Sequence, residues 1–185
     1  MAEQWDIPFV NAIASEIGSA VNFTLGVSNL DRMPIEEAVF IEFSRQLSMR
    51  LDRSAFCIQA AQNRNPAARG RGLFKLINGK VRSEDSSQFV IRSTVVQRDG
   101  QVGNFIEQND LSRLPMMKKN FSLIILDVGS VEDRMAESLG RLCDAVYVVA
   151  PSEMLISPNQ AIRSVVRLQR AGVRIQGCWG VSKAA

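Results

Sequence analysis

The chain has 185 residues, 46% hydrophobic and 22% charged, a balance typical of a soluble globular protein with a single core. Its 22 basic and 19 acidic residues are interspersed and leave a net charge of +3, too small to indicate a partner by itself. The chain has no histidine, no apolar run long enough to span a membrane and no signal-peptide pattern, so we expect a cytoplasmic protein without histidine-based catalysis or metal sites.

The first half of the chain predicts helices and strands in alternation. Hydrophobic residues at helical spacing predict helices over 8–20 and 35–51, and Pro34 suits the first turn of the second. Runs rich in β-forming residues predict strands over 22–28 and 54–61. After the basic loop 62-QNRNPAARGRG-72, we expect GLFKLING to form a short helix ending at Gly79. A further turn or short helix, capped by Ser83, is expected over 83–89.

The second half is more regular. It predicts strands over 89–97, 121–127, 144–150 and 173–181 and helices over 109–119, 131–142 and 158–171. This alternation predicts an α/β fold: a mostly parallel central sheet with helices on both faces, in a Rossmann-like three-layer arrangement. No linker or repeat interrupts the pattern, so we expect one domain over 1–185, with a helical extension over 1–21 and a core over 22–182.

The stretch 123-LIILDVGSVED-133 points to a family. Four apolar residues run into Asp127 and a turn of small residues follows, as in the metal-side strand of a P-loop nucleotidase. Together with 72-GLFKLINGKVRSEDSSQ-88 and the pattern over 121–181, this resembles the cytoplasmic ATPase domain of bacterial tyrosine autokinases of exopolysaccharide export. Those domains belong to the deviant P-loop ATPases, with the septum-positioning and chromosome-partitioning ATPases. The resemblance implies a P-loop NTPase-like fold.

The phosphate-binding loop of that family is not recognisable in this chain. In the family, the first strand leads into G-x-G-K-[ST], whose backbone amides and lysine hold the phosphates. The matching stretch, 26-GVSNLDRMPIEEA-38, has no lysine, and its only glycine is Gly26. Asp31, Glu36 and Glu37 would oppose a triphosphate, and Arg32 is the one cation. A loop so poor in glycine cannot bring its backbone close to a phosphate.

Two further family features are also missing from the sequence. The family's second strand ends in Asp-x-Asp, where this chain has Gln59 and Ala61, and glutamine neither accepts a proton nor binds magnesium well. The autokinases carry a tyrosine-rich tail, whereas the single tyrosine here, Tyr147, lies in an expected strand. Phosphoryl transfer depends on positioning and charge neutralisation, so we expect a pseudo-ATPase without catalytic residues, resident metal or cofactor.

This interpretation makes Asp127, Ser28 and Arg32 remnants of a nucleotide and metal site. The resemblance implies that the protein acts by protein–protein interaction in polysaccharide assembly or its regulation. The partner would be a second copy, an active paralogue or a membrane-associated polysaccharide-export protein, which would place the chain at the inner membrane peripherally. One alternative is a nucleotide-binding ATPase or kinase that holds ATP and magnesium with the same three residues. The acids near Arg32, which are Asp31, Glu36 and Glu37, are also explained by an ordinary helix N-terminus, where acidic residues are favourable.

The arginines raise a second alternative, a partitioning-like protein associated with nucleic acid. They lie in the loop after the second strand and around the last helix, at Arg64, Arg69, Arg71, Arg163, Arg167, Arg170 and Arg174. Arginines spaced around a helix more commonly form a face exposed to solvent. They could also form a basic face towards lipid headgroups or towards another subunit. No aromatic residues interleave with these arginines, so we expect no nucleic acid. The three cysteines, Cys57, Cys143 and Cys178, are expected to be buried free thiols.

Overall fold

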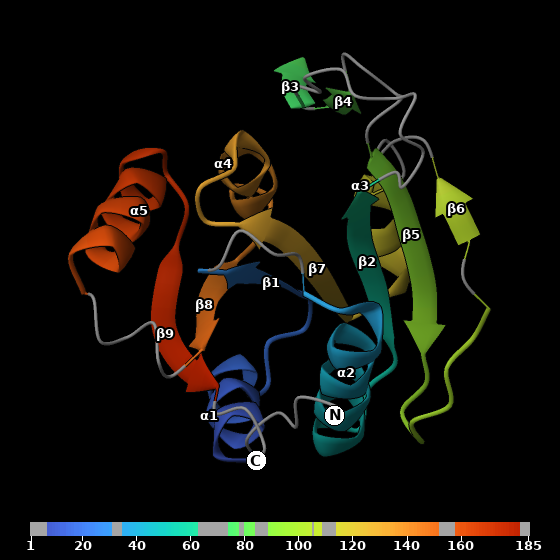
Figure 1. The fold of residues 1–185 in the computed structure, drawn as a ribbon. Helices are drawn as coiled ribbons and strands as arrows, with labels where there is room; N and C mark the ends of the chain where they lie inside the picture. Colours follow the sequence, from blue (N-terminus) through green and yellow to red (C-terminus); the bar gives the residue numbers. More distant parts are fainter. Residues whose placement is uncertain are drawn as a thin grey trace.

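The computed structural model describes residues 7–30, 35–62, 74–77, 80–83, 89–104, 106–108, 114–151 and 158–181. Its centre is a seven-stranded sheet in the order β6-β5-β2-β7-β1-β8-β9 (Figure 1). These strands are β1 (Phe23–Asn29), β2 (Ala55–Gln62), β5 (Phe89–Val96), β6 (Ile106–Gln108), β7 (Leu123–Ser130), β8 (Ala145–Pro151) and β9 (Ile175–Val181). Five strands run parallel, while β5 is antiparallel to β2 and β6 is antiparallel to β5.

Helices cover both faces of this sheet (Figure 1). Helices α1 (Ile7–Ile17) and α2 (Glu37–Leu51) pack on one face, which we call the α2 face. Helices α3 (Leu114–Asn120), α4 (Arg134–Gly140) and α5 (Pro158–Arg170) pack on the other, the α4 face. Strands covered on both sides are apolar without alternation, and all eight residues of β7 are buried. The expected α/β fold with a mostly parallel, doubly covered sheet is confirmed.

The first helix is part of the main core. Phe9 is fully buried, and its ring stacks on those of Phe43 in α2 and Trp179 in β9. The Tyr147 hydroxyl in β8 donates a hydrogen bond to the Glu16 carboxylate of α1. Arg53 donates to the backbone carbonyls just after α1, at residues 18 and 20. The segment 7–17 is therefore built into the α2 face, although we expected 1–21 to extend from the core.

The stretch expected as a short helix ending at Gly79 contains a strand instead, and a second strand follows it. β3 (Phe74–Ile77) pairs antiparallel with β4 (Lys80–Ser83) in a separate two-stranded sheet. The pairing of Ile77 with Lys80 leaves Asn78 and Gly79 as a two-residue connection, and Asn-Gly is a strong hairpin sequence. Ser83 ends β4, and the turn expected after it lies outside the described residues. Strand β6 and the antiparallel course of β5 were not expected either.

The cysteines differ in exposure. Cys57 and Cys143 are buried, as expected, whereas Cys178 is exposed on β9. The strand β9 lies at the edge of the sheet, so a side chain that would be covered in a central strand reaches solvent. The basic loop over 62–72, with Arg64, Arg69 and Arg71, lies largely outside the described residues.

Candidate functional site

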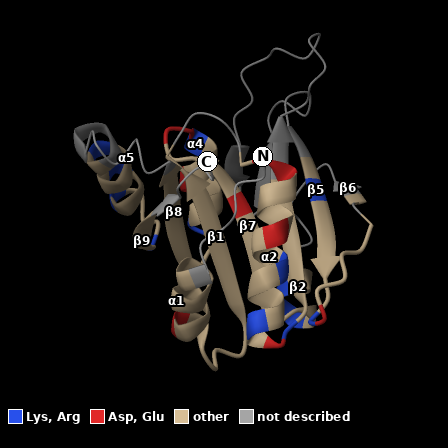
Figure 2. Cartoon of the chain, turned by 60° about the horizontal axis from the view of Figure 1, so that its bottom comes forward, with Lys and Arg blue, Asp and Glu red and all other residues tan. Residues whose placement is uncertain are grey.

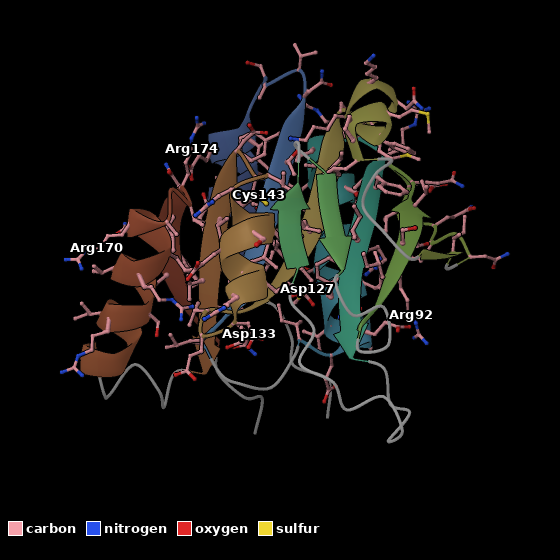
Figure 3. All side chains as sticks on the ribbon, turned by 90° about the horizontal axis from the view of Figure 1, so that it is seen from above. Arg92, Asp127, Asp133, Cys143, Arg170 and Arg174 are labelled. Carbon is pink, nitrogen blue, oxygen red and sulfur yellow. The ribbon has the colours of Figure 1, made fainter. Side chains whose placement is uncertain are left out.

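Asp127 lies near the carboxyl end of β7, the strand between β2 and β1. Ligands of open α/β sheets bind outside the carboxyl ends of the strands, so this edge is the place to look for a site. The register pairs Asp127 with Gln59 of β2 on one side and with Val27 of β1 on the other. Figure 3 shows Asp127 among the central strands. The candidate site is therefore built on Asp127 and the residues that surround it.

The Asp127 carboxyl is enclosed by protein, with only 1% of the residue exposed. Its Oδ1 atom accepts a hydrogen bond from the Gly129 backbone N–H at 2.9 Å. Its Oδ2 atom has no hydrogen-bond partner in the described part of the chain. Burial raises the pKa of Asp127 to about 7, and the Gly129 N–H and the nearby Gln59 amide oppose this rise only in part. Burial thus favours the neutral form of this carboxyl.

Gln59 occupies the position beside Asp127 on the same face of the sheet. It is 5% exposed, and its Nε2 donates a hydrogen bond to the Ile35 carbonyl at 2.9 Å, while its Oε1 has no partner among the described residues. Ile35 is buried in the core of the α2 face, two residues before α2 begins. Gln59 therefore ties the residue preceding the Glu36 N-cap to the strand next to Asp127, and this link helps to close the site.

The N-terminus of α2 carries acids where a phosphate would bind in a P-loop protein. Glu36 is the N-cap residue, and Glu37 lies in the first turn. The Glu37 carboxylate forms an ion pair with Arg92 of β5 at 2.7 Å, and both side chains are partly exposed. A glutamate in the first turn already complements the positive end of the helix dipole. The positive end of the α2 dipole, which could attract an anion, is therefore already complemented by the protein's own carboxylates.

The structure separates Ser28 from Asp127, although they lie on neighbouring strands. The Ser28 hydroxyl is buried and donates a hydrogen bond to the Gly129 carbonyl at 2.8 Å. A register shift falls between Val27 and Ser28, opposite Val128. Alternation along β1 and β7 directs Asp127 to the α2 face, with Val27 and Ile125, and Ser28 to the α4 face. These two expected site residues do not converge on one ligand position.

The remaining expected site residues cannot be placed. Arg32 and Asp31 lie outside the described residues. Among the residues that the structure describes, no group of three histidine, cysteine, aspartate or glutamate side chains is positioned to hold a metal ion. The sequence interpretation missed the link from Gln59 to Ile35 and the pair of Arg92 with Glu37. Both depend on which strands are neighbours, so no local pattern could have indicated them.

Comparison with known proteins adds one structural likeness. No family model matches the chain, and no curated protein matches it. The kinase domain of the Escherichia coli tyrosine kinase ETK superposes with a TM-score of 0.54 at 17% sequence identity. The match covers 95% of this chain and 74% of the ETK kinase-domain chain. The two chains share a fold. The similarity to a tyrosine kinase domain inferred from the sequence is thus borne out at the level of architecture.

Proposed function

We propose that this chain is a catalytically inactive relative of the tyrosine autokinase domains of exopolysaccharide export, acting through protein–protein contacts. The observation that carries the proposal is the buried Asp127, beside Gln59 and below the start of α2. The shared fold with the ETK kinase domain supports the choice of family. The role that follows from it is assembly of a bacterial envelope polysaccharide or regulation of that assembly.

The chemistry of nucleotide binding argues against turnover at this site. A nucleoside triphosphate needs cations and backbone amides for its phosphates, and carboxylates to hold its magnesium. The first lysine in the sequence is Lys75, far beyond the stretch 26–38 that matches the phosphate loop. The acids Glu36 and Glu37 stand at the start of α2 and would repel the phosphates. The residue beside Asp127 on β2, where the family has a carboxylate, is a glutamine in this chain.

A protein that keeps this fold without the reaction can still present the surfaces of its relatives. The partner we propose is a second copy of this chain, an active paralogue or a membrane-associated polysaccharide-export protein. No helix among the described residues is long and apolar enough to cross a membrane. The location that we propose is the cytoplasm, where contact with the export machinery would bring the chain to the inner membrane. We propose no cofactor, catalytic residue or resident metal.

Isothermal titration calorimetry with ATP, in the presence and absence of magnesium, tests the central claim. We expect no binding heat at millimolar ATP and no magnesium-dependent rise in melting temperature. Tight, magnesium-dependent ATP binding would contradict the proposal and favour the non-standard site with Asp127, Ser28 and Arg32. In that case Arg32→Gln should abolish binding, whereas Arg50→Gln, a matched change at the exposed end of α2, should leave it unchanged.

A further inference from the structure

The net positive charge of the chain comes from α4, α5, the start of β9 and the residues beside them. Residues 131–141 and 158–181 hold six arginines and three acidic residues, and the rest of the chain holds sixteen basic and sixteen acidic residues. The net charge of +3 is therefore that of these two segments. All six arginines are exposed, and we call the five other than Arg167 the basic flank: Arg134, Arg141, Arg163, Arg170 and Arg174. Figure 2 shows basic residues along α5.

Intramolecular contacts of two arginines, Arg167 and Arg141, hold α4 and α5 together. Arg167 donates to the carbonyls of residues 131–133 and forms an ion pair with Glu137 at 3.2 Å. Arg141 donates its Nε–H to the Ala171 carbonyl at the end of α5. Arg134, Arg163, Arg170 and Arg174 have no ion pair or hydrogen bond with the described residues. Intramolecular contacts thus explain Arg167 and Arg141, but not these four.

The unpaired arginines are displayed on a supported surface. Arg163 and Arg170 are seven residues apart on α5, so they lie on the same side of the helix about 10 Å apart. Figure 3 shows Arg170 and Arg174 on the outer flank, directed away from the sheet. Leu168 anchors α5 by its buried side chain on the α4 face. Because α5 is also tied to α4 through Arg167, its exposed side needs little reorganisation to meet a partner.

Apolar side chains accompany the arginines on α5. Ile162 is 56% exposed, among the most exposed large hydrophobic side chains described, and Val166, one helical turn later, is half-buried. Helical spacing places both beside the stripe of Arg163 and Arg170. A helix that presents apolar residues next to arginines suits the boundary between lipid headgroups and acyl chains. Residues 131–141 and 158–170 contain no aromatic side chain, so nothing on these helices could stack on exposed bases.

We propose that the basic flank docks on the anionic headgroups of a phospholipid membrane, with Ile162 and Val166 entering the interfacial region. Each arginine close to an anionic membrane strengthens binding about fivefold, so Arg163, Arg170 and Arg174 together give about 100-fold. Such binding is reversible and sensitive to salt. It is direct contact with lipid and does not depend on the proposed loss of nucleotide binding or on an export partner.

Vesicle sedimentation with the full chain tests this proposal. The probes are vesicles of about one third phosphatidylglycerol in phosphatidylcholine and vesicles of phosphatidylcholine alone, at low salt. We expect binding to the anionic vesicles only. The triple variant Arg163→Gln, Arg170→Gln, Arg174→Gln should lose about 100-fold in affinity. The control variant Arg50→Gln, Arg98→Gln removes two exposed arginines that form no ion pair with the described residues, and it should bind almost as well as the parent chain.

Ile162→Ser and a short DNA duplex separate lipid from nucleic acid. Ile162→Ser should weaken vesicle binding several-fold because it removes apolar area from the interface. Absence of binding to anionic vesicles at low salt would overturn the proposal, as would a triple variant that binds like the parent. Tighter binding to the duplex than to the vesicles, unaffected by Ile162→Ser, would overturn it in favour of nucleic acid. All substituted side chains are exposed, and melting curves that match the parent confirm that the variants fold.

Discussion

Asp127 is an enclosed carboxyl group that forms no ion pair with the residues that the structure describes. The Gly129 N–H donates a hydrogen bond to one oxygen of its carboxylate, and the second oxygen has no partner in the described part of the chain. A buried oxygen without a donor favours the neutral acid, and this is why burial outweighs the hydrogen bond in setting the pKa. The residue that indicated an ATPase in the sequence is therefore best understood as a proton-binding group of the interior.

This environment predicts that stability depends on pH through Asp127. Its pKa rises from 3.8 to about 7 on folding, so the native state binds the proton more tightly than the unfolded chain. The resulting stabilisation is complete below about pH 4, declines as pH rises towards 7 and is absent above it. The free energy of unfolding should fall by about 2 to 4 kcal/mol over this range. Urea unfolding at a series of pH values measures it.

The Asp127→Asn variant is the control for this pH dependence. Asparagine does not titrate, so the decline between about pH 4 and pH 7 should largely disappear, whatever the variant's absolute stability. The chain has no histidine, so no other side chain with an ordinary pKa titrates near neutrality. Parallel pH profiles for the two proteins would show that Asp127 is not the group responsible.

At the scale of elements, the sequence predicts the helices and strands that a local hydrophobic pattern determines. It misses the strands that depend on pairing with a neighbouring strand. The parallel strands and their crossover helices were predicted to within a few residues because each carries its own apolar run or helical stripe. Strand β6 and the β3–β4 hairpin are short and depend on a partner strand. The candidate site shows the same difference between local pattern and strand pairing. The run LIILD located Asp127, but the closure by Gln59 and Ile35 follows from the β2–β7 register.

Gly26 illustrates a residue whose role changes with the structure. As the only glycine of the stretch matched to the phosphate loop, it could be taken for a remnant of phosphate binding. A Cβ atom there would lie 2.8 Å from both the Cys143 Sγ and a Val146 methyl carbon, and 3.3 Å from a Val128 methyl carbon. Close packing of β1 against the α4 face therefore accounts for this glycine.

The substitution Gly26→Ala should destabilise the protein by about 1 to 3 kcal/mol because the added methyl overpacks a closed core. Cys143→Ala removes one of the two atoms closest to the added methyl. The destabilisation caused by Cys143→Ala should therefore be smaller in the Gly26→Ala background than in the parent. Urea unfolding of the parent, both single variants and the double variant gives the coupling free energy. Independent, additive effects of the two substitutions would contradict the packing explanation.

At the scale of the whole molecule, the structure combines a closed sheet edge with a basic outer surface. Near the carboxyl ends of the central strands Asp127 is enclosed, and Gln59 is tied to Ile35, two residues before α2 begins. The exposed arginines lie on another part of the molecule, over α4 and α5. The first helix completes the α2 face and contributes aromatic contacts that reach from α2 to β9. The side chains of α1 therefore belong to the same core as those of α2 and the sheet.

The integration of α1 predicts a large effect for Phe9→Ala. The substitution removes a fully buried ring that contacts α2, β8 and β9, so we expect a loss of about 3 to 5 kcal/mol in the free energy of unfolding. Unfolding followed by circular dichroism and by tryptophan fluorescence should still give coincident transitions, because α1 and the sheet share one core. Val21→Ala, at an 80% exposed position after the same helix, is the control and should change stability little. A small effect of Phe9→Ala, or a separate early transition, would mean that residues 7–17 are an independent extension.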